Sequence, residues 1–196
     1  NSILEQLDSS HKAYFTNTQN SPKIECMSTE WVERTIQGQI ERHLKRGKSV
    51  LLLGPRQTGK SSCLNRLRWD LEISFLIQRT RLEYEQDPDR LIKEVEAIKT
   101  KVPRILIDEV QKVPSIMDVV QYLVDKKKAI FALTGSSARK LKTRDVINLL
   151  PGRIVLLRMD PLSLLEFDSA SLEELLLFGS LPEILLTKSK EDREID

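Results

Sequence analysis

Cysteine is scarce in this sequence. Only Cys26 and Cys63 occur, and their spacing fits neither a metal site nor a disulfide framework. Two isolated cysteines are typical of a reducing compartment, because disulfides persist mainly in oxidising ones. Long apolar runs are missing as well: no stretch reaches the roughly 18 apolar residues of a membrane span, and the N-terminus lacks a basic segment followed by an apolar one. These absences predict a cytoplasmic protein with no membrane partner.

Neither sign of charge is in excess. The 31 Lys and Arg residues nearly balance the 29 Asp and Glu residues, which gives a formal net charge of +2. The whole molecule therefore has no strong field for nucleic acid, and such a partner would need a local patch. The 196 residues and the hydrophobic content of 40% indicate one main domain. His11 and His43 are isolated, so we interpret them as solvated side chains rather than metal ligands.

The sequence GPRQTGKS, which starts at residue 54, has the G-x-x-x-x-G-K-[ST] spacing of a phosphate-binding loop. Gly54, Gly59, Lys60 and Ser61 occupy the four specified places. Such a loop needs a strand before it and a helix after it, whose N-terminus faces the anion. The apolar run from Val50 to Leu53 predicts that strand, and KSSCLNRLRW predicts a helix with its apolar residues on one face.

Each residue type in this loop has a chemical reason. Glycines let the backbone come close to a polyphosphate and adopt positive φ angles, so that N–H groups surround the anion. The Lys60 ammonium would reach the β and γ phosphates, and the Ser61 hydroxyl would ligate Mg²⁺. We predict that the nucleotide is bound by Gly54, Pro55, Arg56, Gln57, Thr58, Gly59, Lys60, Ser61 and Ser62.

The rest of the chain alternates between helix and strand patterns. Residues 1–27 are polar and show no period, which we interpret as a tail or linker, and a helix capped by Thr29 and stopped by Gly47 follows. The later patterns predict strands at Ile73–Ile77, Ile105–Ile107, AIFALTGSS and GRIVLLR, and helices at DPDRLIKEVEAI and IMDVVQYLV. Asp87 is the expected cap of the first of these helices. We interpret Lys126–Lys128 as the solvent-facing end of a helix. The alternation predicts an α/β fold with a parallel sheet covered on both faces.

Two acids follow the strand in ILIDE. Asp108 comes at the carboxyl end of that strand, the edge where open α/β sheets bind ligands, so its carboxylate would hold Mg²⁺ directly or through water. Glu109 is the next residue, where a hydrolytic enzyme places a group that orients and polarises the attacking water. The alternative is a pair of ordinary loop acids.

Two further residues are catalytic candidates. Ser136 in FALTGSS ends the next strand, with Thr134 behind it, and would lie close to the γ phosphate; a plain turn serine is the alternative. Arg153 follows Gly152 directly before a strand and is our candidate for the arginine that stabilises charge on the transferred phosphoryl group. A structural salt bridge is an equal alternative for Arg153.

Seven runs of this sequence together resemble the prokaryotic AAA-type P-loop ATPases that carry an uncharacterised C-terminal domain. They are LLGPRQTGKSSCL, DPDRLIKEVEAI, ILIDEVQKVP, FALTGSSARKLK, NLLPGR, DPLSLLEF and GSLPEILL, over roughly residues 28–186. The resemblance implies an additional-strand P-loop NTPase fold, three-layer α/β/α with a parallel sheet of order 5-1-4-3-2, and it implies ATP and Mg²⁺ as ligands. It also makes Gly54–Ser61 the Walker A loop, Asp108 and Glu109 the Walker B pair, and Ser136 the sensor.

The same resemblance bears on the end of the chain. Arg153 occupies the arginine of the family's L-x-G-R, whereas Pro151 stands where the family usually has a small residue. Similar members continue for a further domain, but this sequence stops at Asp196. We therefore expect a tail at 1–27, an ATPase domain at 28–160 and the helical start of a truncated C-terminal region at 161–196.

Three functions fit these patterns. The leading hypothesis is a Mg²⁺-dependent ATPase that couples hydrolysis to a conformational change, in a homo-oligomer where Arg153 approaches the nucleotide of the next subunit. The alternative is a nucleotide-binding switch with little turnover. A third hypothesis adds nucleic-acid contact through ARKLKTR, by way of Arg139, Lys140, Lys142 and Arg144, which also suit a solvated or intersubunit surface. A small-molecule kinase is less favoured, because no acceptor-binding lid is evident.

Overall fold

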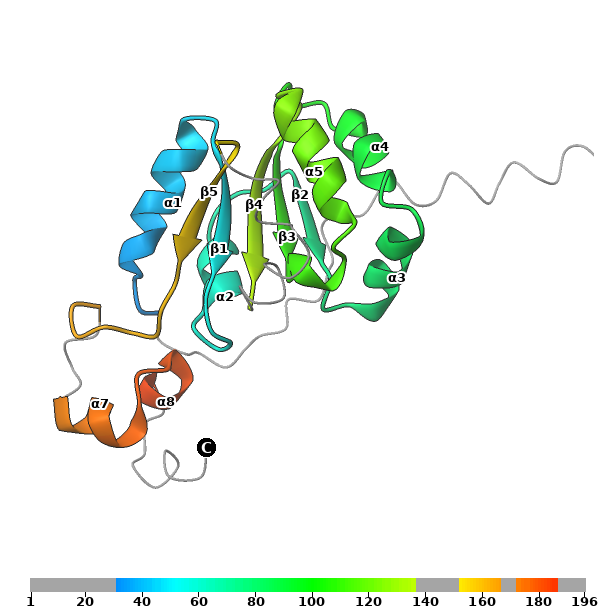
Figure 1. The fold of residues 1–196 in the computed structure, drawn as a ribbon. Coiled ribbons are helices and arrows are strands. Elements are labelled where there is room, and N and C mark those ends of the chain that lie inside the picture. The colour runs from blue at the N-terminus through cyan, green and yellow to red at the C-terminus, as the bar shows by residue number, and fades with distance from the viewer. Residues whose placement is uncertain (1–30, 137–151, 167–171, 187–196) are drawn as a thin grey trace, which may run out of the picture. The chain divides into compact units, whose positions relative to one another are not determined.

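A five-stranded parallel sheet organises the molecule (Figure 1). The computed structural model describes residues 31–136, 152–166 and 172–186. The strands are β1 (Ser49–Leu53), β2 (Leu71–Ser74), β3 (Arg104–Asp108), β4 (Ile130–Gly135) and β5 (Ile154–Arg158). They lie in the order β2-β3-β4-β1-β5, and every neighbouring pair is parallel. Read from the other end, this order is 5-1-4-3-2, so the predicted additional-strand P-loop fold is confirmed.

Helices connect the strands and lie on both faces of the sheet. They are α1 (Thr35–Lys45), α2 (Lys60–Leu64), α3 (Gln78–Gln86), α4 (Arg90–Ala97), the 3₁₀ turn η1 (Val110–Lys112), α5 (Ile116–Asp125), α7 (Leu172–Phe178) and α8 (Pro182–Leu186). A parallel strand needs a crossover before its neighbour, and these helices supply most of the crossovers. None of the described helices is long and apolar enough to cross a membrane.

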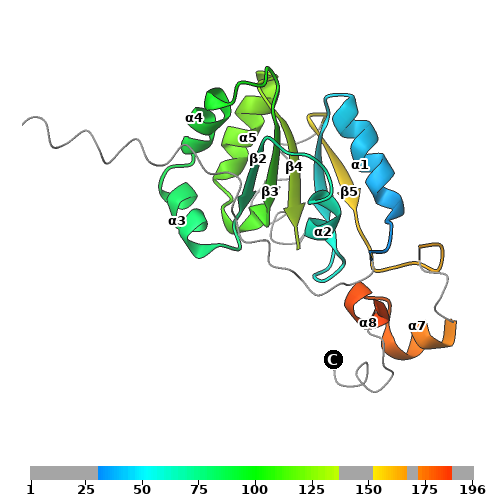
Figure 2. The same cartoon turned by 180° about the vertical axis from the view of Figure 1, so that it is seen from behind.

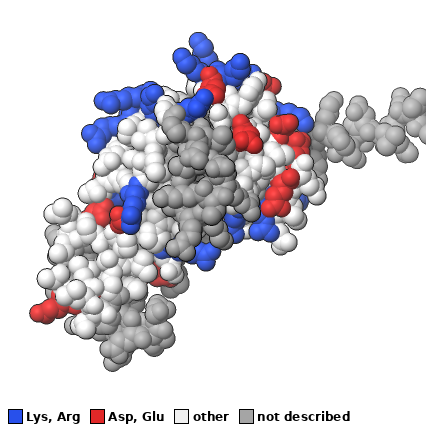
Figure 3. Space-filling view, in the orientation of Figure 1, with Lys and Arg blue, Asp and Glu red and all other residues white. Residues whose placement is uncertain are grey.

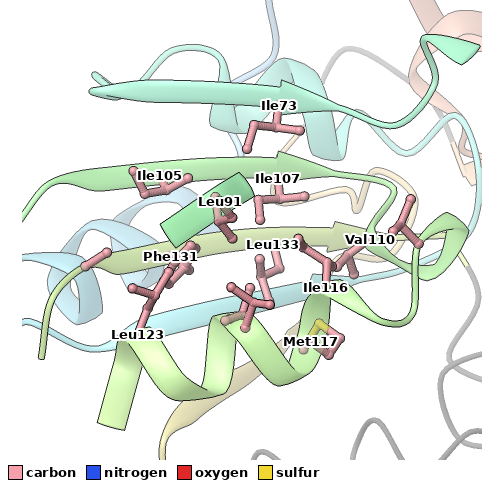
Figure 4. Close-up of a cluster of buried hydrophobic side chains, with 14 of the residues drawn as sticks. Ile73, Leu91, Ile105, Ile107, Val110, Ile116, Met117, Leu123, Phe131 and Leu133 are labelled. Carbon is pink, nitrogen blue, oxygen red and sulfur yellow. The ribbon is translucent and has the colours of Figure 1, made fainter. Parts of the chain in front are cut away.

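Alternate residues of each strand pack against different helices. Leu51 of β1, Ile107 of β3 and Leu133 of β4 belong to one buried cluster that also contains residues of α4 and α5 (Figure 4). The intervening residues face the opposite side, where α2 packs against β4 (Figure 2). Strands buried on both faces lose the polar alternation of a half-exposed strand, which is why SVLLL and RILID are nearly continuous apolar runs.

Several predicted elements need correction at their ends. The strand expected at Ile73–Ile77 stops at Ser74, and the chain turns there into α3, a helix that the sequence patterns did not predict. The helix expected over KSSCLNRLRW ends at Leu64, and the next residues form a turn. The helix of DPDRLIKEVEAI begins at Arg90 after Asp89, not after Asp87. The expected cap Thr29 and the predicted tail 1–27 lie outside the described residues.

Candidate functional site

The candidate site lies at the carboxyl edge of the sheet, where the loops after β1, β3 and β4 meet. Strand register sets this meeting, because Leu53 pairs with Gly135 and Leu52 with Thr134 across β1 and β4. Ser74 at the end of β2 pairs with Asp108 at the end of β3 in the same way. Parallel strands that end in register bring side chains distant in sequence to one edge.

The two glycines of the phosphate loop serve different purposes. Gly59 has φ +87°, the left-handed conformation that side chains rarely adopt, and it directly precedes α2. Gly54 is not left-handed. A Cβ at Gly54 would lie 2.0 Å from the Met159 backbone oxygen, so a glycine is required there because the chain after β5 passes so close. The expectation that both glycines supply positive φ therefore holds only for Gly59.

Lys60 begins α2 and turns its ammonium back over the loop. Its Nζ donates to the Gly54 carbonyl oxygen at 3.0 Å and also to the Pro55 carbonyl oxygen. Burial lowers the pKa of Lys60, while the nearby charges of Glu109 and Asp108 act in the opposite direction. The lysine charge is therefore held between the loop backbone and the two acids.

Asp108 connects the phosphate loop to the end of β4. Its Oδ1 accepts a hydrogen bond from Ser61 Oγ at 2.8 Å and another from Thr134 Oγ1. The hydroxyl and the carboxylate are hard oxygen donors of the kind that Mg²⁺ prefers. Mg²⁺ usually takes one or two carboxylates together with phosphate oxygens, and within the described residues no cluster of three His, Cys, Asp or Glu side chains could hold a metal alone. Ser61 and Asp108 therefore fit the predicted metal site.

Glu109 is fixed by three polar contacts. Its backbone is left-handed, with φ +58°, and its N–H donates to Thr134 Oγ1 at 2.9 Å. Its Oε2 accepts from Ser136 Oγ at 3.0 Å and from the Gln111 side-chain amide. Gln111 also donates to Ser136 Oγ at 3.1 Å, so the three side chains form a closed triangle. The predicted pair of Glu109 and Ser136 thus lies together, whereas sequence reasoning missed Gln111.

An open cavity of about 430 Å³ lies beside the phosphate loop and Glu109. Its lining consists of Arg56, Gln57, Gly59, Lys60, Ser61, Ser62, Leu76, Glu109 and Lys112. Most of these residues belong to the predicted nucleotide-binding loop, and both Glu109 and Lys60 face the same space. The cavity is large enough for a polyphosphate and open enough for its remainder to extend outwards.

Arg34 supports the phosphate loop from outside the cavity and was not predicted. Its side chain is only 5% exposed, and its guanidinium donates to the Thr58 carbonyl oxygen at 2.6 Å and to the Asp160 carbonyl oxygen at 2.6 Å. Glu166 accepts from Arg34 Nε at 3.2 Å and from the Thr35 N–H at 2.9 Å. Burial would raise the pKa of Glu166, but hydrogen bonds from Arg34, Thr35 and Ser163 outweigh it and lower the pKa to about 2.

Arg153 does not lie with the other candidates. It directly precedes β5, and because the sheet is parallel this position is at the amino edge, opposite the phosphate loop. Its Nε forms an ion pair with Asp125 Oδ1 at 2.5 Å. Arg153 therefore cannot reach the cavity of its own subunit. The predicted cations 139–144 lie outside the described residues.

The strand order and the glycine-lysine loop after β1 define a P-loop NTPase fold. Comparison with known proteins agrees. The model of an AAA domain matches residues 46–168, more than half of the sequence, and the chain belongs to this family.

Individual relatives and solved structures share only part of their sequence and length with this chain. Uncharacterised proteins of Mycobacterium tuberculosis and Mycobacterium bovis are each 32% identical over 178 residues, which cover 87% of this chain and 37% of each relative. The chain thus spans little more than a third of the curated relatives it matches. The crystal structure of Cdc6p from Pyrobaculum aerophilum has a TM-score of 0.47 and 14% identity, over 69% of this chain and 48% of that one.

Proposed function

We propose that this chain binds ATP with Mg²⁺ and hydrolyses it, and that hydrolysis is coupled to a conformational change in an assembly of AAA-type subunits. Residues 28–160 would form the ATPase domain, and 161–196 the start of a further region. The cytoplasmic location that the sequence predicts stays a prediction.

One observation supports the proposal most strongly. Ser61 and Asp108 are 47 positions apart, yet Ser61 Oγ donates to Asp108 Oδ1 at 2.8 Å beside the cavity that Lys60 and Glu109 also line. A hydroxyl and a carboxylate for a divalent cation, an ammonium for phosphate and a second carboxylate for water are the groups that phosphoryl transfer requires. A structural turn would have no reason to gather all four.

The roles follow from the positions. Lys60 would release the loop carbonyls and bind the β and γ phosphate oxygens, and Gly59 with the following amides would surround the phosphates. Ser61 and Asp108 would hold Mg²⁺, which supplies charge neutralisation when bound. Glu109 would accept a hydrogen bond from the attacking water and orient it, and Ser136 would keep the Glu109 carboxylate in place.

A panel of nucleotides tests the proposal. Purified chain is titrated with ATP, GTP, ADP and AMP, with and without Mg²⁺, and phosphate release is measured in the same samples. We expect triphosphates to bind more tightly than AMP and Mg²⁺ to strengthen triphosphate binding. Equal affinity for all four nucleotides, or none, would contradict a polyphosphate site.

Glu109→Gln separates binding from chemistry. The amide keeps the shape of the side chain but loses its charge, so we expect ATP still to bind while phosphate release falls by at least about 100-fold, the usual scale for a positioned acid–base group. Glu85→Gln makes the same change on α3 and should leave release unaltered. Release by Glu109→Gln at the parent's rate would show that another group orients the water.

A nucleotide-binding switch with little turnover is the second candidate. One observation favours it, since Glu109 Oε2 already accepts hydrogen bonds from both Gln111 and Ser136. A carboxylate held in this way is less free to take a proton from water. Tight ATP binding by the parent with no measurable phosphate release would support the switch over the ATPase.

A further inference from the structure

The five turns that lead into the strands carry an unusual excess of positive charge. We call these turns the amino-edge turns, and they comprise residues 46–48, 65–70, 98–103, 126–129 and 152–153. Their cations are Arg46, Lys48, Arg66, Arg68, Lys99, Lys101, Lys126, Lys127, Lys128 and Arg153. Asp70 is their only acid. In a chain whose total charge is +2, this edge holds a concentrated positive field.

The turns lie side by side because all five strands are parallel. In sheet order they precede β2, β3, β4, β1 and β5, so every strand contributes at least one cation to the row. Contacts join the strand starts and turns at this edge: the N–H of Ile130, the first residue of β4, donates to the Pro103 carbonyl oxygen at 2.9 Å, and Thr100 Oγ1 lies 3.1 Å from Asp70 Oδ1. In Figure 3, Lys and Arg side chains gather along the upper margin, where the strands begin.

The acids near this edge are already engaged. Asp70 accepts from the Arg104 N–H at 2.8 Å, and Glu96 and Asp125 form ion pairs with Lys128 and Arg153. Among the described residues, seven exposed cations of the amino-edge turns form no ion pair with an acid: Arg46, Lys48, Arg68, Lys99, Lys101, Lys126 and Lys127. No described acid neutralises their charge.

One of these lysines occupies a position that favours glycine. α1 and α5 end in the same way, with the first residue after the cap donating to the carbonyl three positions back. In α1 this residue is Gly47, with φ +71°, and in α5 it is Lys127, with φ +53°. Helix ends attract cations, but this attraction does not require a lysine at a left-handed position. The chain places a charge where the backbone alone would favour glycine.

We propose that the amino-edge turns bind the phosphate backbone of duplex nucleic acid without sequence preference. Five strands about 4.8 Å apart set out a row of roughly 20 Å. A duplex presents a phosphate on each strand about every 3.4 Å along its axis, so roughly six phosphates of one strand lie along that length, and part of them face one side. Within the amino-edge turns Val102 is the one large exposed apolar side chain, whereas a membrane-binding surface would insert several.

Fluorescence anisotropy with a 20-base-pair duplex of mixed sequence, at about 50 to 200 mM salt and without nucleotide, tests the proposal. The test variant is Lys99→Gln, Lys101→Gln, Lys126→Gln. The control variant is Arg79→Gln, Lys93→Gln, Arg158→Gln, which removes the same charge from exposed positions elsewhere. All substituted side chains are exposed, so thermal unfolding should show that both variants fold.

We expect the parent and the control variant to bind the duplex, with affinity that falls steeply as salt rises. The test variant should bind at least about tenfold more weakly at about 50 mM salt, and its salt slope should be smaller by about one for each phosphate contact removed. Lys127→Gly should raise the thermal midpoint and still weaken duplex binding, a combination that a purely structural lysine would not produce.

Three results would overturn the proposal: no duplex binding by the parent at about 50 mM salt, equal weakening by the test and control variants, or binding only to vesicles that contain phosphatidylserine. Because no nucleotide is present, these results do not depend on the proposed ATPase activity. A chain that binds the duplex but not ATP would disprove the proposed function alone.

Discussion

The charged side chains at the two edges of the sheet differ in their burial and in their hydrogen-bond partners. At the carboxyl edge, Asp108, Glu109 and Lys60 are held by hydrogen bonds to named partners, and Asp108 and Lys60 are buried. At the amino edge, exposed lysines and arginines outnumber acids and mostly lack an ionic partner among the described residues. Fixed, desolvated groups can position one ligand, whereas exposed cations attract any polyanion and are screened by salt.

Parallel strands alone therefore do not decide which edge of a sheet binds a ligand. The strand ends meet at both edges, but among the described residues the glycine loop whose backbone can surround an anion lies at the carboxyl edge. The amino edge has helix ends and short turns, so it presents side chains instead.

Arg153 is an exception to this difference between the edges. It lies at the amino edge, but the hypothesis gives it a role at the nucleotide of the next subunit. If it serves the neighbouring subunit, Arg153→Ala should retain ATP affinity and lose about 10³-fold or more in phosphate release. The ion pair with Asp125 is exposed, so its loss alone should hardly change stability.

A mixing experiment distinguishes this role from a structural one. Lys60→Ala chains should partly restore phosphate release to Arg153→Ala chains by supplying an intact arginine across the interface. Arg158→Ala, at the other end of β5, is the matched control and should behave as the parent. No restoration in mixtures that co-assemble would leave Arg153 as a surface ion-pair residue.

Gly54→Ala should damage the carboxyl edge through packing rather than charge. The new Cβ would lie 2.0 Å from the Met159 backbone oxygen, so β1 and the chain after β5 would have to separate. We expect the free energy of unfolding to fall by about 3 kcal/mol, at the upper end for overpacking. In urea unfolding, Gly38→Ala is the control: nothing lies within 4 Å of its added Cβ in α1, and it should stabilise by about 1 kcal/mol. Equal stability of the two variants would contradict the close approach.

Glu166→Gln should change how stability responds to acid. The pKa of Glu166 is lowered to about 2 in the folded chain, so its contribution is complete above the unfolded pKa near 4.5 and is lost as pH falls towards 2. We expect the variant to be less stable than the parent at pH 7 by about 1.5 to 3 kcal/mol, the range for a hydrogen bond to a charged group.

The difference between the two proteins should shrink between pH 4.5 and 2. Urea unfolding at several pH values checks this, with Glu41→Gln on α1 as the control that keeps the parent's profile. A constant difference across this pH range would show that Glu166 is not held ionised by its partners.

Local patterns could predict much of the fold and part of the site. The loop spacing identified Ser61, and the alternation of helix and strand patterns predicted a parallel sheet with Asp108 and Ser136 at strand ends. The strand order itself was implied only by the family resemblance. Strand lengths were less predictable: Phe75 to Ile77 are apolar like the strand before them, but the chain turns after Ser74.

Polar contacts between residues far apart in the sequence could not be predicted from local patterns. Arg34 and Glu166 are 132 positions apart, and each by itself looks like a surface charge. Nothing in their local sequence shows that a loop carbonyl needs a donor. The positive amino edge was hidden for a related reason, because its cations are scattered over five turns and cancel against acids elsewhere in the total charge.

The most direct test of the account is a pair of titrations, ATP and AMP in the presence of Mg²⁺, on the parent and on Lys60→Ala, with the exposed Lys93→Ala as control. A lysine charge about 4 Å from phosphate at an effective dielectric of about 20 contributes about 4 kcal/mol before solvent compensation. We expect Lys60→Ala to weaken ATP binding by about 100-fold or more and AMP binding far less, and Lys93→Ala to change neither. Equal losses for ATP and AMP, or no loss at all, would remove Lys60 from a phosphate site and contradict the proposed nucleotide function.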